Sequence, residues 1–192
     1  MKLFYFFCIL IIFVSCNFND DKDVLNLSNE QLKEIIRKKP PTSEQNHNDA
    51  ILKLEENYQK DSNDLLNVYN LAFMKCTNCL KGVSSETKNC MDALIYFQRV
   101  KKINKFYRDS KAFYNSYLCY KKMEKQEEAL KELDVFIRDN QNKDKIQVNF
   151  YLQRAELLNE LGRNTEACDD LKRALKFDTT GYFTLKNKIP CK

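Results

Sequence analysis

Apolar residues recur at intervals of three or four positions along the C-terminal part of this chain. One apolar stripe comprises Tyr151, Ala155 and Leu158. A second stripe, which follows Leu161-Gly162, comprises Ala167, Leu171 and Ala174. Such spacing is typical of amphipathic α-helices, and a glycine directly after a stripe favours the end of a helix. Residues 148–181 are therefore predicted to form two antiparallel helices joined by a short turn.

The same pattern can be laid over three upstream segments. Residues 110–143 carry it at Phe113, Tyr117, Tyr120, Ala129, Leu133 and Phe136. Another helix pair is predicted upstream. Its first helix lies near residues 64–75, and the apolar stripe of its second helix comprises Ala93, Phe97 and Val100. The faintest copy is a second helix alone, with Ala50, Leu54 and Tyr58. The chain is therefore predicted to consist of repeated helix pairs from about residue 48 onward.

The order of these residues resembles the tetratricopeptide-repeat (TPR) signature. Residues 148–181 contain the elements of that signature in order. These are a large residue, a small residue, Leu-Gly at the turn, and then an alanine, a bulky residue and a second alanine. The first alanines of successive second helices are 43, 36 and 38 residues apart, against a TPR period of 34. The residues beyond the 34-residue period fall in two polar segments, residues 76–89 and 139–145. Longer loops are tolerated there, because the entropic cost of closing a loop grows only slowly with its length.

The resemblance covers residues 48–188 and implies the fold. It implies an all-α, short array of about three TPR-like antiparallel helix hairpins with a C-terminal capping helix at residues 182–188. Small residues at the alanine positions let paired helices approach closely, and bulky neighbours fill the grooves between them. The closing segment of the chain is similar to the C-termini of TPR proteins of Bacteroidetes. Only three Gly and three Pro are present, which disfavours a turn-rich β architecture.

The first sixteen residues indicate export. Lys2 precedes an unbroken apolar run over residues 3–14. A helix of that length spans roughly 18 Å, whereas the core of a bilayer is about 30 Å thick. The run is therefore predicted to belong to a cleaved signal peptide, residues 1–15, rather than to a transmembrane helix.

The run ends in Phe13-Val14-Ser15-Cys16, which resembles the lipobox of bacterial lipoproteins. The resemblance implies that Cys16 is acylated, for example with palmitate, and becomes the mature N-terminus. Several acyl chains make membrane attachment stable, so the protein is expected to be exported and lipid-anchored, at the periplasmic or surface face of the outer membrane. The alternative is an ordinary secretory signal that happens to contain a cysteine. The acidic stretch at residues 20–23 resembles surface-export signals of Bacteroidetes lipoproteins, or is a solvated spacer.

Residues 16–43 are predicted to be a lipidated N-terminus and polar tether with one short helix. Ser28 and Gln31 have the spacing of a capping box, which begins a helix over about residues 29–38. Pro40-Pro41 ends it. A polar linker, residues 42–48, contains the only histidine, His47. The TPR-like helical domain is predicted to occupy residues 44–192.

The residues offer no basis for catalysis. The chain has no Gly-rich phosphate loop, no Gly-x-Ser-x-Gly elbow and no His-Glu-x-x-His motif. The chain is therefore expected not to be an enzyme and to use no cofactor, metal or small-molecule substrate. The formal charge of +5 is mild, and acidic and basic residues are mixed along the chain, which gives no reason to expect a nucleic-acid partner.

Six cysteines remain after Cys8 and Cys16 are set aside. An even number in an exported protein favours disulfides. We expect Cys90 to pair with Cys76 or Cys79 and Cys168 to pair with Cys191, while Cys119 has the pattern of a buried thiol. A zinc site or a redox-active Cys-x-x-Cys at residues 76–79 is disfavoured. Three cysteines without a histidine lack the fourth zinc ligand, and the pair falls at the end of a predicted helix rather than at its N-terminus.

The first helix of each TPR lines the inner groove of the array. Carried over to this chain, the resemblance assigns the groove to Tyr69, Phe73, Lys111, Tyr114, Leu118, Lys121, Lys122, Leu152, Glu156, Asn159 and Glu160. Such a surface, aromatic at its centre and charged at its ends, suits an extended peptide or a helix. Tyr114 and Leu118 stand where chaperone-binding TPRs hold a terminal carboxylate, so that particular function is not expected.

Three functions follow as hypotheses. The first is a membrane-anchored protein-binding module, a scaffold or adaptor that holds a protein or peptide partner in a bacterial cell-envelope complex. The second is a disulfide-stapled structural or accessory lipoprotein without a dedicated ligand. The third is a metal or redox protein that uses the cysteines of residues 76–90. The first rests on analogy at the level of the fold.

Overall fold

A computed structural model describes residues 24, 27–38, 44–82, 86–141, 144–176 and 188–191. Within these residues the chain is helical and contains no β-strand. The helices are α1 (Asn29–Lys38), α2 (Glu44–Lys60), α3 (Leu65–Lys81), α4 (Glu86–Asn104), α5 (Lys111–Lys122), α6 (Gln126–Asp139), α7 (Asp144–Glu160) and α8 (Asn164–Leu175). The predicted all-α fold is confirmed.

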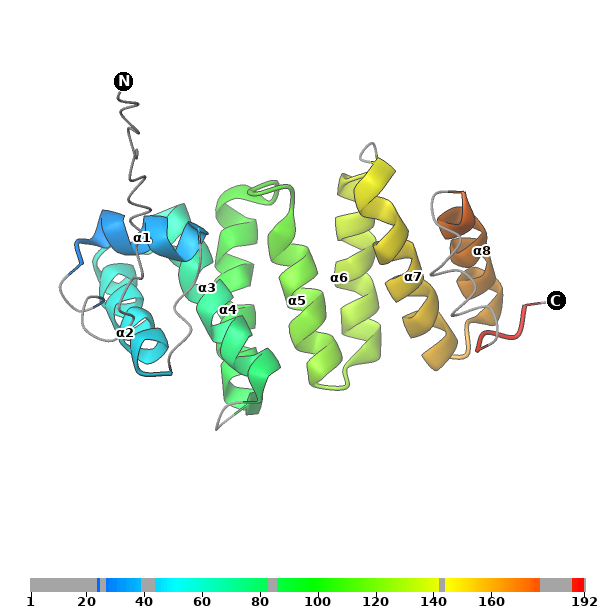
Figure 1. Ribbon diagram of the computed structural model, residues 1–192, viewed down its shortest axis with the longest axis horizontal. Coiled ribbons are helices and arrows are strands. Elements are labelled where there is room, and N and C mark those ends of the chain that lie inside the picture. Colours follow the sequence, from blue (N-terminus) through cyan, green and yellow to red (C-terminus); the bar gives the residue numbers. More distant parts are fainter. Residues whose placement is uncertain are drawn as a thin grey trace, which may run out of the picture.

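The helices form a row of TPR-like hairpins. The most extensive packing joins α3 to α4, α5 to α6 and α7 to α8, and the next joins α4 to α5, α2 to α3 and α6 to α7. Each hairpin therefore packs mainly on its neighbours in the chain, as in other repeat proteins. Figure 1 shows this order along the longest axis of the molecule, with α1 and α2 at one end and α8 at the other.

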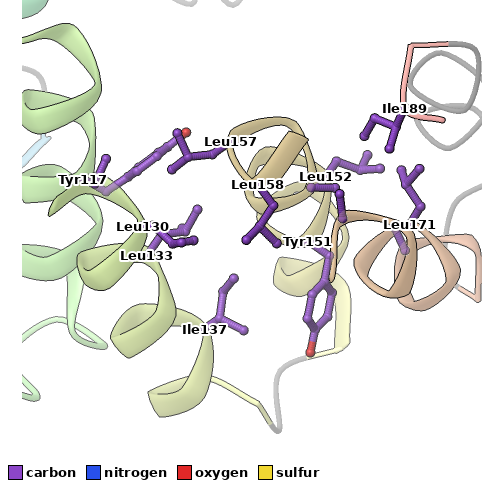
Figure 2. Close-up of a cluster of buried hydrophobic side chains, with 14 of the residues drawn as sticks. Tyr117, Leu130, Leu133, Ile137, Tyr151, Leu152, Leu157, Leu158, Leu171 and Ile189 are labelled. Carbon is purple, nitrogen blue, oxygen red and sulfur yellow. The ribbon is translucent and has the colours of Figure 1, made fainter. Parts of the chain in front are cut away.

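The predicted apolar stripes form the core. Their alanines at positions 93, 129, 155, 167 and 174 are all 0% exposed, and the bulky residues between them are buried. Because an alanine side chain is small, the backbones of two helices can approach each other at these positions. The largest buried cluster joins α5, α6, α7 and α8 with Ile189, which Figure 2 shows beside Leu152 and Leu171.

Two hairpin turns have the same geometry with different residues. After α7, Gly162 has a φ of 73°, and the Arg163 amide donates to the Leu158 carbonyl at 2.8 Å. This confirms the predicted Leu-Gly helix end. After α5, Glu124 takes the same left-handed conformation with a φ of 59°, and the Lys125 amide donates to the Tyr120 carbonyl at 2.9 Å. This turn contains no glycine, so the Leu-Gly signal of residues 148–181 does not recur in residues 110–143.

Helix α1 is part of the packed array. Its N-terminus has the predicted capping box, in which the Ser28 amide donates to Gln31 Oε1 at 2.8 Å and the Gln31 amide donates to Ser28 Oγ at 3.3 Å. Leu32 and Ile36 are buried in a cluster with residues of α2 and α3. The ammonium of Lys33 also pairs with Asp64, the N-cap of α3. Helices α1 and α2 therefore both pack against α3 at the N-terminal end of the array, where the sequence predicted only half a repeat.

Two segments predicted to be irregular are helical. Helix α2 begins at Glu44, so His47 lies inside it rather than in a linker. Its side chain is buried, with Nε2 3.1 Å from the Met74 carbonyl oxygen. The prediction of a loop at residues 76–89 is also wrong, because α3 continues to Lys81 and α4 begins at Glu86. The extra residues lengthen this hairpin by extending its helices.

Residues 1–23 and 177–187 lie outside the described part of the chain. The signal peptide, Cys16 and nearly all of the predicted capping helix at residues 182–188 fall there. Among the described residues, no helix is both long enough and apolar enough to cross a membrane.

The packing of α1 generates a prediction about stability. Leu32→Ala is expected to lower the free energy of unfolding by about 2–5 kcal/mol, because Leu32 is fully buried between α1 and its neighbours. Lys38→Ala, on the exposed end of the same helix, is the matched control and should change it by less than about 0.5 kcal/mol. Urea denaturation of both variants measures the difference. Equal stabilities would mean that α1 is a tether and not part of the core.

Candidate functional site: the α3–α5–α7 face

The residues predicted to line the groove lie on adjacent helices. Helix α3 packs directly on α5, and the Asn115 side-chain amide of α5 donates to the Tyr69 hydroxyl of α3 at 3.2 Å. Lys121 of α5 and Glu156 of α7 form an ion pair at 3.0 Å. Side chains of α3, α5 and α7 therefore share one surface. We call it the α3–α5–α7 face and assign to it Phe73, Lys111, Tyr114, Leu118, Lys121, Lys122, Glu156, Asn159 and Glu160.

Two of the predicted groove residues are buried core residues instead. Leu152 is 9% exposed and packs in the α7–α8 cluster. Tyr69 is 3% exposed because the turn before α5 covers it, with the Arg108 guanidinium 4.8 Å and the Tyr107 ring 5.4 Å from its ring centroid. Burial raises the pKa of Tyr69. Arg108 and Tyr107 thus take the accessible position that the sequence assigned to Tyr69.

An unusual backbone turn places Arg108 over Tyr69. Arg108, Asp109 and Ser110 have φ angles of 49°, 58° and 61°, a left-handed conformation that is costly for residues with a side chain. Helix α6 and its C-cap hold the turn, because the Asn140 side chain donates to the Asp109 carbonyl at 3.0 Å and the Ser110 hydroxyl donates to an Asp139 carboxylate oxygen at 3.2 Å. The segment contains no glycine, so no residue type in it predicts this turn.

The centre of the face is aromatic. The Tyr114 ring lies 4.9 Å from that of Phe150, 5.3 Å from that of Phe136 and 5.7 Å from that of Tyr117. These distances are those of favourable ring pairs. Tyr114 remains half-buried, and its hydroxyl accepts a hydrogen bond from the Gln153 side chain at 3.4 Å. The cluster fixes one edge of an aromatic ring at the surface between α5 and α7.

Charged side chains flank this aromatic centre. Lys111 and Lys122, at the two ends of α5, and Glu160, at the end of α7, are exposed. Lys121 is half-buried. Burial would lower the pKa of Lys121, but its hydrogen bond with Glu156 and the charges of Glu156 and Glu160 outweigh burial and raise it. The face is therefore basic along α5 and acidic at the end of α7.

The cysteines occupy three places in the array. A disulfide joins Cys79 to Cys90 near the tip of the α3–α4 hairpin, with a Cα–Cα distance of 4.9 Å. This is one of the two pairings that the sequence left open. A second disulfide joins Cys168 of α8 to Cys191, with a Cα–Cα distance of 5.6 Å, in the expected pairing. Cys76 and Cys119 are buried free thiols. No group of three or more potential metal ligands occurs in the described ranges.

The opposite side of α7 carries a charged pocket of about 170 Å³ between α6 and α8. Arg154 of α7 donates to both carboxylate oxygens of Asp170 on α8 at 2.6 and 2.7 Å, and to Asp134 on α6 at 2.7 Å. Burial would lower the pKa of Arg154, but the hydrogen bonds and charges of both carboxylates outweigh burial and raise it. Because these charges pair with one another, we interpret the residues that line the pocket as a structural ion-pair network.

Similar cations lie at the two preceding junctions between hairpins. Lys75 of α3 lies between Glu55 of α2, at 2.8 Å, and Asp92 of α4, at 3.7 Å. Lys101 of α4 binds both carboxylate oxygens of Glu132 on α6 at 2.7 Å. Each junction therefore has one largely buried cation that connects neighbouring outer helices.

Comparisons with known proteins find similarity among solved structures. No protein-family model matches the chain, and no curated protein matches it. Among solved structures, the chain is similar to a tetratricopeptide repeat protein from Parabacteroides merdae ATCC 43184. The two are 15% identical, the match covers 83% of this chain and 77% of the other, and the TM-score is 0.41.

The Arg154 network generates a prediction. Asp170→Ala is expected to lower the free energy of unfolding by about 3–5 kcal/mol, because it leaves a largely buried guanidinium without its bidentate partner. The double variant Arg154→Met/Asp170→Leu should be less destabilised than Asp170→Ala, since it removes both charges and keeps the volume. Thermal and urea denaturation test this order, and the reverse order would show that the pair contributes net stability.

Proposed function

We propose that this chain is an exported, lipid-anchored protein-binding module that holds a segment of a partner protein against the α3–α5–α7 face. In this role it is a scaffold or adaptor in a bacterial cell-envelope complex. The observation that carries the proposal is the continuity of the face. Side chains of α5 and α7 contact each other across it, in the Lys121–Glu156 ion pair and the hydrogen bond between Gln153 and Tyr114, and α3 packs directly on α5.

The chemistry of the face indicates the kind of ligand. Phe73, Tyr114 and Leu118 are half-buried and expose part of an apolar surface. The exposed Lys111 and Lys122 favour acidic groups beside it, and Glu160 favours a basic group at the α7 end. An extended peptide or a single helix fits this arrangement if it carries an apolar residue, acidic groups on the α5 side of that residue and a basic group on the α7 side.

The anchor is proposed to be Cys16. Residues 17–28 separate it from the first residue of α1, and twelve residues can span at most roughly 40 Å. The array would then remain within a few tens of ångströms of the membrane surface. Partners would be proteins of the same membrane or proteins that assemble on it.

A structural or accessory lipoprotein is the second candidate, and one feature favours it. Polar groups on the face pair with each other, as in the Lys121–Glu156 ion pair and the hydrogen bond between Gln153 and Tyr114. In addition, disulfides fix the α3–α4 hairpin and α8. A surface whose polar groups are already paired, on a fold that disulfides stabilise, needs no ligand to be stable.

Anchoring is tested with Cys16→Ser in the bacterium. The unmodified chain is expected in the membrane fraction and labelled by a palmitate analogue, while the variant loses the label and is released or retained as its precursor. Cys8→Ser, within the apolar run, is the matched control and should keep the label. A labelled Cys16→Ser chain, or an unlabelled wild type, would rule out acylation at Cys16.

Partner binding is tested with Lys111→Glu/Lys122→Glu. This double variant reverses the basic part of the face and is expected to lower crosslinked partner recovery from native membranes at least tenfold, measured by quantitative mass spectrometry. Lys88→Glu/Lys131→Glu makes the same charge change on the exposed sides of α4 and α6 and should retain recovery. Equal recovery of the same proteins by both variants would exclude the face. Nothing above background with the wild type would support the accessory role.

A further inference from the structure

Cys76 and Cys119 lie together although they belong to different hairpins. Cys76 is on α3 and Cys119 is on α5, and these helices pack directly on each other. The Cys76 sulfur lies 3.8 Å from the carbonyl oxygen of Asn115, one helical turn before Cys119. Both residues belong to the same buried cluster.

The reactive and charged groups beside the two thiols are already bonded to other partners. Cys79, three residues after Cys76, is already bonded to Cys90, so the two cysteines of α3 serve different partners. The nearest charged group that acts on Cys119 is the Lys101 ammonium, which is itself paired with Glu132. Cys76 is 3% exposed and Cys119 is 0% exposed. The pair is therefore an isolated, buried dithiol between two repeats.

We propose that Cys76 and Cys119 form a third disulfide in the exported protein, which bonds α3 of one hairpin to α5 of the next. The position of the Cys76 sulfur against the turn of α5 that ends at Cys119, within one buried cluster, carries this assignment. An exported chain folds where disulfides form and persist, and the other four cysteines of the domain are already paired. The proposal rests on the export proposed above, and it does not depend on the α3–α5–α7 face binding a partner.

The reaction requires a disulfide donor of the protein thiol–disulfide oxidoreductase class. One cysteine thiolate attacks a sulfur of the donor disulfide, which forms a mixed disulfide and releases one donor thiolate. The second cysteine thiolate then attacks the first cysteine's sulfur, which forms the Cys76–Cys119 bond and releases the second donor thiolate. Two electrons pass to the donor, and its two thiolates take up the two protons lost by the cysteines.

The bond forms during folding. In the folded chain the hydrogen bond with Cys76, and then burial, raise the pKa of the Cys119 thiol. A protonated, buried thiol reacts slowly, because the thiolate is the nucleophile and must reach the donor. The exchange therefore belongs to the stage before α5 closes over α3.

The cross-link would act directly beneath the α3–α5–α7 face. Asn115 contacts Cys76 through its carbonyl oxygen and holds the Tyr69 hydroxyl through its side chain. Tyr69 in turn supports Arg108 at the surface. A covalent bond at this point fixes the position of the α5–α6 hairpin against the α3–α4 hairpin. It completes a series of staples that begins with the Cys79–Cys90 bond and ends with the Cys168–Cys191 bond.

Peptide mapping of the full chain tests the proposal. The protein is acid-quenched in its own cells, alkylated under denaturing, non-reducing conditions and digested with trypsin. Cleavage after lysine and arginine places the four cysteines concerned in peptides 76–81, 89–99 and 112–121. We expect these three peptides to be joined in one species without alkylated cysteine. Peptides 76–81 and 89–99 joined alone, with alkylated Cys76 and Cys119, would overturn the proposal.

Two variants exclude disulfide shuffling as the source of that species. In Cys119→Ser, peptides 76–81 and 89–99 should remain joined, with one alkylated cysteine in peptide 76–81. In Cys79→Ser/Cys90→Ser, peptides 76–81 and 112–121 should still be joined to each other. If that double variant shows Cys76 and Cys119 alkylated, the link depends on exchange with Cys79 or Cys90 and the proposal is wrong.

Discussion

The array depends on small side chains where its helices pack. In each predicted hairpin from Ala93 onward, the apolar stripe of the second helix begins with an alanine that is fully buried. Helices that meet over alanine approach more closely than helices that meet over larger residues, and the bulky neighbours then fill the grooves. This close pairing makes each hairpin a unit and places α3, α5 and α7 in one row. The α3–α5–α7 face is a consequence of that row.

Each junction between hairpins from α2 to α8 contains a largely buried ion pair in addition to its apolar packing. Lys75, Lys101 and Arg154 are each between 12% and 15% exposed at the side chain, and each is paired with a carboxylate of a neighbouring helix. Buried ion pairs add little net stability because desolvation offsets their attraction, but a wrong alignment leaves a charge unpaired. These pairs therefore favour one arrangement of successive hairpins, and with it the shape of the face that they support.

The sequence predicted what depends on local pattern and missed what depends on distant contacts. The alanine stripes, the capping box at Ser28 and the Leu-Gly turn at residue 162 were all readable, because each is a short-range signal. Residues 76–89 were read as a loop because polar residues dominate there, yet a longer hairpin and its disulfide keep them largely helical. Tyr69 was placed on the surface because the TPR frame does not contain the left-handed turn that folds Arg108 over it.

The central claim is that a partner protein lies on the α3–α5–α7 face, and site-specific photocrosslinking tests it most directly. A photoreactive phenylalanine analogue is placed singly at exposed positions of the face, Lys111 and Glu160, and of the outer helices, Lys88 and Lys131, in cells that carry the native membrane. The account predicts one protein crosslinked from Lys111 and Glu160 and none from Lys88 or Lys131. The same crosslinks from all four positions, or crosslinks from the outer positions alone, would contradict it.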